Sequence, residues 1–243
     1  HRLILIHVVG RLDDDRIDRC IEFGNSERSS CNSSSADSIR SNLKYASAFS
    51  NEPKLEICPL NASEILDVYR NTSLPKFGGG GGGYNREHSW PKSYGFPTDG
   101  SSNYPYTDCH HLFLSDEGYN SSRSNKLYAG CDENCAERTT VANGGAGGGS
   151  GVYPGQSGWT TTGIWETWMG RRGDVARALF YMDIRYEGGT HSGTGVLEPD
   201  LVLTDDDTLV VTSGANASLA HMGRLSDLLA WHAADPVDAR EQA

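Results

Sequence analysis

Apolar residues recur at helical spacing in two late stretches of the chain. Between Gly173 and Tyr186 they form a broad apolar face, and Asp174 lies near its start, where a helix favours negative charge. A second stretch runs from Leu219 to Ala234 and ends before Pro236. The pattern therefore predicts two amphipathic helices in the C-terminal half.

Extended and glycine-rich segments lie before these helices. Trp159 to Trp168 is aromatic and rich in Thr, which is typical of strands. Residues 143–158 are rich in Gly and are expected to form an exposed loop. Six consecutive glycines, 78–83, are interpreted as a flexible connector in preference to a hinge or a phosphate-binding loop, because no GxxxxGK[ST] pattern follows them.

The first third of the chain has the weakest pattern. Residues 11–23 have a fair helical spacing, and 26–50 are rich in Ser and Asn and predict a surface loop. Residues 54–69 fit either a strand followed by a helical turn or two strands. We therefore divide the chain into an N-terminal region, 1–76, packed on the core, and a C-terminal domain, 77–243.

Charge limits the classes of function. The formal net charge is −11, from 32 acidic and 21 basic residues, which argues against bulk binding of nucleic acid across the surface. A small basic cleft on an acidic body remains compatible with this balance. The basic residues that concentrate around one stretch and a later helix are Arg86, Lys92, Arg123, Lys126, Arg171, Arg172 and Arg177. The chain has no apolar run of about 18 residues, so we expect no contact with a membrane.

Cysteines and glycosylation motifs favour an oxidising compartment. The six cysteines are Cys20, Cys31, Cys58, Cys109, Cys131 and Cys135. An even number in loop-rich surroundings predicts three disulfides, of which Cys131–Cys135 is the preferred pair, and a zinc site at this pair is the weaker alternative. Five N-x-S/T motifs occur, at Asn32, Asn61, Asn71, Asn120 and Asn216. Together these features predict a secreted, disulfide-bonded glycoprotein.

Candidate chemistry concentrates between Tyr84 and Asn125. A Glu87-His88 pair comes first, a His110-His111 pair follows, and Asn120 comes after it. Histidine has the side-chain pKa nearest neutrality and suits a general base. Carboxylate and amide oxygens are ligands that Mg²⁺ accepts. The stretch thus contains the groups needed to activate a water beside a hard divalent metal.

Four segments in order strengthen this interpretation. They read REHSWPKS at 86–93, DCHHLFLSDEGYNSSRSNK at 108–126, RGDVARALFYMDIRYEGG at 172–189 and LLAWHAADPVDARE at 228–241. Together they resemble the endonuclease I family of secreted and periplasmic nucleases, which are His-Me finger, or ββα-metal, nucleases. One departure is the segment Phe113-Leu114-Ser115, where the family usually has a Pro.

The resemblance implies an α+β fold: a ββα nuclease core in an endonuclease I-like catalytic domain, with additional packed helices and long Gly-rich loops. It implies that His88 ends a hairpin strand and deprotonates the attacking water. Glu87 and Asn120 would bind one Mg²⁺, with Ca²⁺ or Mn²⁺ as alternatives. The Asn120 amide must then carry no glycan. His111 would be an orienting residue, and Asn125 has a similar structural role.

Arginines and lysines supply the expected contacts with the substrate. Arg123 lies three residues after Asn120, and either holds a phosphate as a catalytic residue or is a surface arginine. Arg86, Lys92 and Arg177 are expected to bind the substrate, with a structural role as the alternative for Arg177.

The resemblance therefore implies a secreted or periplasmic, Mg²⁺-dependent, sequence-nonspecific endonuclease that hydrolyses DNA, with RNA as a further substrate. The partner would be nucleic acid, and self-association stays open. The alternative is an extracellular structural or self-assembling protein that retains a nuclease-like fold. Glu87, His88 and Asn120 together favour the enzyme, because a scaffold needs none of the three.

Overall fold

The computed structural model describes residues 64–76 and 83–238, in a mixed arrangement of helices and strands. The strands are β1 (Glu64–Leu66), β2 (Ser73–Pro75), β3 (Tyr84–His88), β4 (Leu112–Asp116), β5 (Leu127–Tyr128), β6 (Ala136–Arg138), β7 (Gly158–Thr160), β8 (Ile164–Glu166), β9 (Asp200–Leu203) and β10 (Leu219–Met222). The α-helices are α4 (Tyr104–Thr107), α5 (Glu117–Arg123), α6 (Arg172–Arg185) and α7 (Leu225–Ala234), and the 3₁₀ turns are η3 (Cys109–His111) and η4 (Asp207–Leu209). None of these helices is long and apolar enough to cross a membrane.

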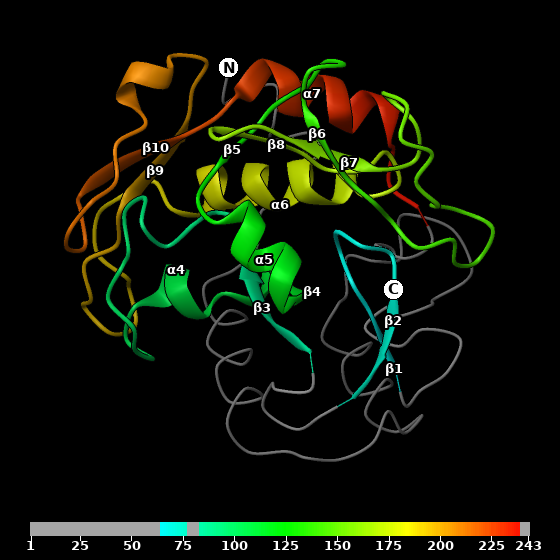
Figure 1. Cartoon of the computed structure of the whole chain (residues 1–243). Helices are drawn as coiled ribbons and strands as arrows, with labels where there is room; N and C mark the ends of the chain where they lie inside the picture. The colour runs from blue at the N-terminus through cyan, green and yellow to red at the C-terminus, as the bar shows by residue number, and fades with distance from the viewer. Residues whose placement is uncertain (1–63, 77–82, 239–243) are drawn as a thin grey trace.

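Helix α6 lies at the centre of the molecule (Figure 1). It packs against α7, β9 and η3. The apolar face predicted from the sequence is shielded from water. Its completely buried residues are Val175, Leu179, Phe180 and Met182. The predicted helix at 173–186 is confirmed, with its bounds displaced by one residue.

A four-stranded sheet follows the order β5-β8-β7-β6. Strands β5 and β8 are parallel, and the other two pairs are antiparallel. Trp159 on β7 and Trp165 on β8 are buried. The extended segment predicted at 159–168 is thus confirmed as two strands, β7 and β8.

The prediction of one helix from Leu219 to Ala234 is wrong in its first turn. Residues 219–222 form β10, which pairs in parallel with β9, and only Leu225–Ala234 is helical. Burial alternates along β10, so that Ala220 and Met222 face the core, and this two-residue period is that of a strand. Gly223 separates the two elements. A Cβ there would meet the carbonyl oxygen of Thr204 at 2.6 Å, so a side chain would push β10 away from the strand beside it.

The ββα element consists of β3, β4 and α5 (Figure 1). Strands β3 and β4 are antiparallel, and their register pairs His88 with Leu112. Asp116 ends β4 and caps α5 by accepting hydrogen bonds from the backbone amides of Gly118 (2.9 Å) and Tyr119 (3.1 Å). The cap starts the helix immediately after the strand. His88 therefore ends β3, and Asn120 lies on the following helix, as the resemblance implied.

Residues 64–76 form the β1–β2 hairpin and a turn that contacts the ββα element. The backbone amide of Val68 donates to the carbonyl oxygen of Leu114 (3.1 Å), and Arg70 forms an ion pair with Asp116 (2.8 Å). Part of region 1–76 is thus packed on the core. The features expected at 11–23, at 26–50 and at the first five of the six glycines lie outside the described residues.

Cys131 and Cys135 form a disulfide, with Cα atoms 6.0 Å apart, which confirms the preferred pair and excludes the zinc alternative there. Cys109 is exposed on η3. The other three cysteines lie outside the described residues, so the oxidation of all six stays a prediction.

Candidate active site

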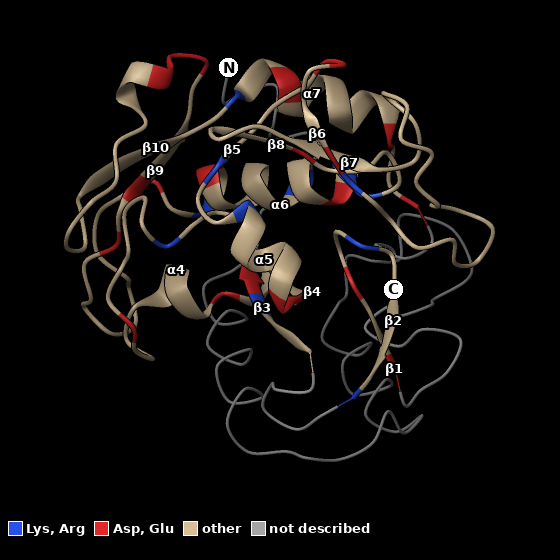
Figure 2. Ribbon diagram, in the orientation of Figure 1, with Lys and Arg blue, Asp and Glu red and all other residues tan. Residues whose placement is uncertain are grey.

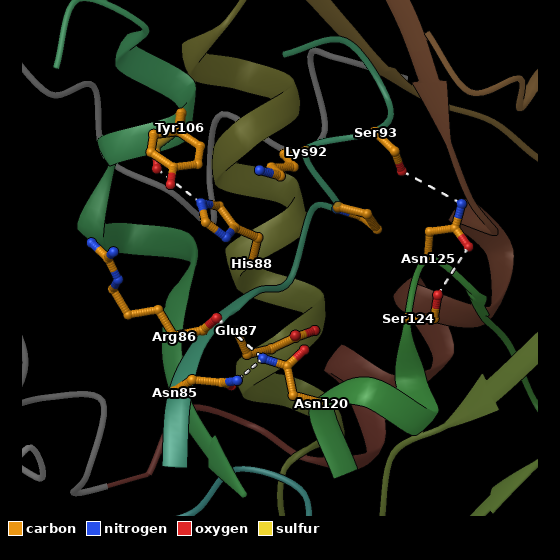
Figure 3. Close-up of a pocket in the computed structure, with 11 residues that line it drawn as sticks. Asn85, Arg86, Glu87, His88, Lys92, Ser93, Tyr106, Asn120, Ser124 and Asn125 are labelled. Atoms are coloured by element: carbon orange, nitrogen blue, oxygen red, sulfur yellow. Dashed lines mark hydrogen bonds between the residues drawn. The ribbon is translucent and has the colours of Figure 1, made fainter. Parts of the chain in front are cut away.

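A cavity of about 540 Å³ opens between β3, the turn after it, α4 and α5 (Figure 3). It is lined by Asn85, Arg86, Glu87, His88, Pro91, Lys92, Ser93, Tyr106, Asn120, Ser124 and Asn125. Six of the expected site residues are among them. Arg123, His111 and Arg177 are not, and their positions are described below.

His88 is held by the backbone of α4. Its Nε2 atom lies 2.9 Å from the carbonyl oxygen of Tyr106, and the two rings stack with centroids 5.0 Å apart. A carbonyl oxygen only accepts, so Nε2 carries the proton and Nδ1 keeps its lone pair. Burial lowers the pKa of His88, and nearby Arg86 and Lys92 lower it further. His88 is therefore neutral at neutral pH and can accept a proton at Nδ1.

Glu87 is 2% exposed, and its two carboxylate oxygens have different surroundings. Oε1 accepts hydrogen bonds from the Tyr69 hydroxyl (2.7 Å) and from Nη1 of Arg123 (2.7 Å). Among the described residues nothing donates to Oε2. Burial raises the pKa of Glu87, whereas the Arg123 guanidinium and the Tyr69 hydroxyl oppose that shift. The carboxylate thus offers one oxygen to the cavity.

Asn120 faces the same cavity from α5. Its Nδ2 atom donates to the side-chain oxygen of Asn85 and to the carbonyl oxygen of Arg86 (3.1 Å). These two bonds fix the orientation of the amide and turn Oδ1 away from the two acceptors of Nδ2. Figure 3 shows the Asn120 amide beside the Glu87 carboxylate, with His88 farther along β3.

These donors fit a hard divalent cation. A carboxylate oxygen and an amide carbonyl oxygen, both without a protein donor in the part of the chain that the structure describes, meet at one wall of the cavity. Mg²⁺ is typically bound through one or two such ligands and keeps several waters. Glu87 and Asn120 are thus compatible with one Mg²⁺.

Both alternatives for Arg123, a catalytic residue that holds a phosphate and a surface arginine, are wrong. Arg123 is completely buried, so it is not a surface arginine. Besides Glu87, its guanidinium donates to the carbonyl oxygens of His88 (2.9 Å) and Ser89 (2.7 Å), and it lies 4.3 Å from the centre of the Tyr128 ring. Because these groups occupy its guanidinium and Arg123 does not line the cavity, it is not placed to hold a phosphate there.

His111 is completely buried beneath His88. Its Nε2 atom lies 2.7 Å from the carbonyl oxygen of Pro105, and its ring centroid is 5.3 Å from that of His88. Burial lowers the pKa of His111 to about 3. The ring is therefore neutral and buried, which agrees with an orienting role and argues against a second base.

Asp108 and Asn125 hold the segments around the cavity in place. Asp108 is buried and accepts from His110, Tyr181 and Tyr186. Burial alone would raise the pKa of Asp108, but the hydrogen bonds and charge of His110 hold it at about 2. Asn125 lines the cavity, and its backbone carbonyl accepts from the Tyr94 hydroxyl (2.9 Å).

The cationic residues divide into two groups. Arg86 and Lys92 line the cavity, where Glu87 is the acidic lining residue. The acidic residues of α7, β9 and the turn after β9 lie on elements that do not line it (Figure 2). Arg177 does not line the cavity, so its expected role in binding the substrate is wrong. Its half-buried guanidinium donates to the carbonyl oxygen of Asp235 (2.7 Å) and lies 3.1 Å from His232 Nδ1, which fits the structural alternative.

Sequence reasoning missed three contributors. The Tyr106 carbonyl accepts from His88, the Asn85 side chain accepts from the Asn120 amide, and Tyr69 donates to Glu87. Asn85 lies next to the recognised motif and could have been found there. Tyr69 and Tyr106 stand in no pattern that indicates their contacts.

A hairpin and helix that bring His, carboxylate and amide groups to one cavity are the features of the ββα-metal nuclease class. The chain belongs to the Endonuclease I family, whose model matches residues 23–243. The match begins well before residue 77, so it extends the resemblance into the N-terminal region.

Two relatives carry a more specific description. The chain is 35% identical over 202 residues to an extracellular ribonuclease of Bacillus amyloliquefaciens and to one of Bacillus subtilis (strain 168). Each alignment covers 82% of this chain and 59% of the relative. The chain thus spans less than two thirds of the length of these relatives.

Proposed function

We propose that this protein is a secreted, metal-dependent, sequence-nonspecific endonuclease that hydrolyses phosphodiester bonds in DNA and RNA. The observation that carries the proposal is that His88, Glu87 and Asn120 line one cavity. Membership of the Endonuclease I family supports nuclease activity. The relatives described as extracellular ribonucleases support secretion and add RNA to the expected substrates.

In this proposal His88 is the general base. Its Nε2–H is held by the Tyr106 carbonyl, which leaves Nδ1 to take a proton from a water that attacks phosphorus. A positioned histidine typically contributes about 10²–10⁴-fold to such a reaction. Glu87 and Asn120 would hold one Mg²⁺, which when bound supplies charge neutralisation at the phosphoryl and leaving 3′ oxygens.

Arg86 and Lys92 would hold the phosphate backbone at the cavity. Arg86 is exposed, and Lys92 contacts Asp99 (2.5 Å) on the surface. Backbone contacts of this kind carry no sequence information, which agrees with nonspecific cleavage. No group at this cavity, in the described residues, favours the structural or self-assembling alternative.

A cleavage assay tests the proposal. Supercoiled plasmid and single-stranded RNA are incubated with the protein in Mg²⁺ and in excess EDTA, with the His88→Ala variant as the matched control. We expect both substrates to be cut in Mg²⁺ by the wild type and to stay intact in EDTA. Folded wild-type protein that cuts neither substrate, or cuts equally well in EDTA, would refute it. Cleavage of one substrate alone would narrow the substrate class.

A further inference from the structure

The oxygen Oε1 of Glu87 has both of its lone-pair sites occupied. A carboxylate oxygen accepts about two hydrogen bonds. The Tyr69 hydroxyl and Nη1 of Arg123 each lie 2.7 Å from Oε1. Both donors are buried, so water does not compete with them. Oε1 is therefore saturated by protein donors, and Oε2 remains for a ligand in the cavity.

Tyr69 is held in place by three different parts of the fold. Its backbone amide donates to Asp67 (2.8 Å), and its ring lies 5.0 Å from that of Trp165. The adjacent Val68 accepts from the indole N–H of Trp168 (3.1 Å). These contacts fix the direction of the phenol, and hence the rotamer of the carboxylate to which it donates.

The direction of the Tyr69 hydroxyl follows from its second partner. The Tyr128 hydroxyl lies 2.5 Å from the Tyr69 hydroxyl. Tyr69 has one hydroxyl proton, and it is donated to Glu87, so Tyr128 must be the donor to Tyr69. The chain of donors thus runs from Tyr128 through Tyr69 to Glu87, and it ends on the candidate metal ligand.

We propose that Tyr69 is a positioning residue of the metal site: with Arg123 it saturates Oε1 of Glu87, so that the carboxylate binds the cation through Oε2 alone. The inference rests on the proposed function, in which Glu87 is a metal ligand. It places Tyr69, which precedes the glycine run, in the proposed active site. Tyr69 lies 18 positions before Glu87, whose carboxylate it orients.

The test uses the full chain and Mn²⁺, whose binding is measured by electron paramagnetic resonance of the free ion, without nucleic acid. The variant is Tyr69→Phe. Loss of a hydrogen bond to a metal ligand typically weakens metal affinity about 10–100-fold. We expect the Kd for Mn²⁺ to rise by that factor. The Mg²⁺ concentration for half-maximal cleavage should rise in parallel, with most of the rate recovered at saturating Mg²⁺.

Two matched controls separate positioning from the general loss of a buried hydroxyl. Tyr186→Phe removes a buried hydroxyl that donates to the buried carboxylate of Asp108 (2.9 Å), which does not line the cavity of Glu87 and Asn120. Tyr128→Phe removes the outer member of the donor chain and leaves the bond from Tyr69 to Glu87 intact. Both should bind Mn²⁺ within about threefold of the wild type, far less than the change expected when the hydrogen bond to the ligand is lost.

A wild-type Kd in folded Tyr69→Phe, or an equal loss in all three variants, would overturn the inference. If Tyr69→Phe does not fold, Arg123→Lys is measured in its place. This variant keeps the positive charge but loses the forked guanidinium, which donates to Glu87 and to the backbone carbonyls of His88 and Ser89. An unchanged Kd for Mn²⁺ would therefore overturn the inference too. Glu87→Gln distinguishes failure of the proposed metal site from failure of the role of Tyr69. If it binds Mn²⁺ normally, the proposed metal site fails, whereas if it alone loses Mn²⁺, only the role of Tyr69 fails.

Discussion

Replacement of His111 by Gln should flatten the pH dependence of stability in mild acid. The folded state keeps His111 neutral because burial lowers its pKa to about 3. The unfolded chain binds a proton at this residue near pH 6.5. Between these two values the unfolded state holds a proton that the folded state lacks, so the free energy of unfolding falls as the pH falls.

The magnitude follows from the width of this window. Each pH unit well below 6.5 costs up to about 1.4 kcal/mol, so at pH 4.5 the loss from His111 is roughly 2–3 kcal/mol. Glutamine can still donate to the carbonyl oxygen of Pro105, but it does not titrate. The variant is less stable than the wild type at neutral pH because it loses packing. It does not show the further fall in the free energy of unfolding that protonation of His111 causes in acid.

Urea unfolding in EDTA at several pH values between 7.5 and 4.5 provides the measurement. The wild type should be the more stable protein at pH 7.5, and this advantage should shrink by about 2–3 kcal/mol at pH 4.5. Groups common to both proteins cancel in the difference. Asp108, whose pKa is held at about 2, titrates below this range. Parallel curves for the two proteins would refute the assignment of a buried neutral imidazole at His111.

Other changes test the site and its surroundings. His88→Ala should keep Mg²⁺ binding, measured by calorimetry, while kcat falls about 10²–10⁴-fold; near-normal turnover would remove His88 as the base. Because burial lowers the pKa of His88, wild-type cleavage should persist below pH 6.5 and fail only as the imidazole becomes protonated, which a pH–rate profile checks. Lys92→Ala should raise KM and reduce the salt slope of binding by about one, as loss of a phosphate contact does. Arg177→Met should instead leave KM unchanged and lower the free energy of unfolding by about 1–3 kcal/mol, because the carbonyl oxygen of Asp235 loses its part-buried hydrogen-bond donor.

The local motif predicted which three side chains, Glu87, His88 and Asn120, meet at the cavity. Glu87 and His88 are adjacent in the sequence, and a hairpin followed by a capped helix was enough to bring Asn120 to them. Helix α6 was predictable because its apolar face extends over several turns. Residues 219–222 were mistaken for helix because a four-residue strand is too short to show its alternation before a helical pattern begins.

Burial of arginine and the contacts of Tyr69 could not be predicted. An arginine with no other information is expected at the surface, and Arg123 is buried only because Glu87, His88 and Ser89 surround its guanidinium. These partners lie 34 to 36 residues away in the chain. Such pairings depend on tertiary packing, which a single sequence does not display.

The acceptor that fixes the tautomer of His88 is a peptide carbonyl, and any amino acid at position 106 would supply it. The tautomer of His88 is therefore insensitive to most point mutations at that position, although they would change the stacked ring. Insertions or deletions that displace α4 would instead remove the acceptor. Across natural variants, we expect the identity of residue 106 to drift while the spacing between His88 and this carbonyl stays constant.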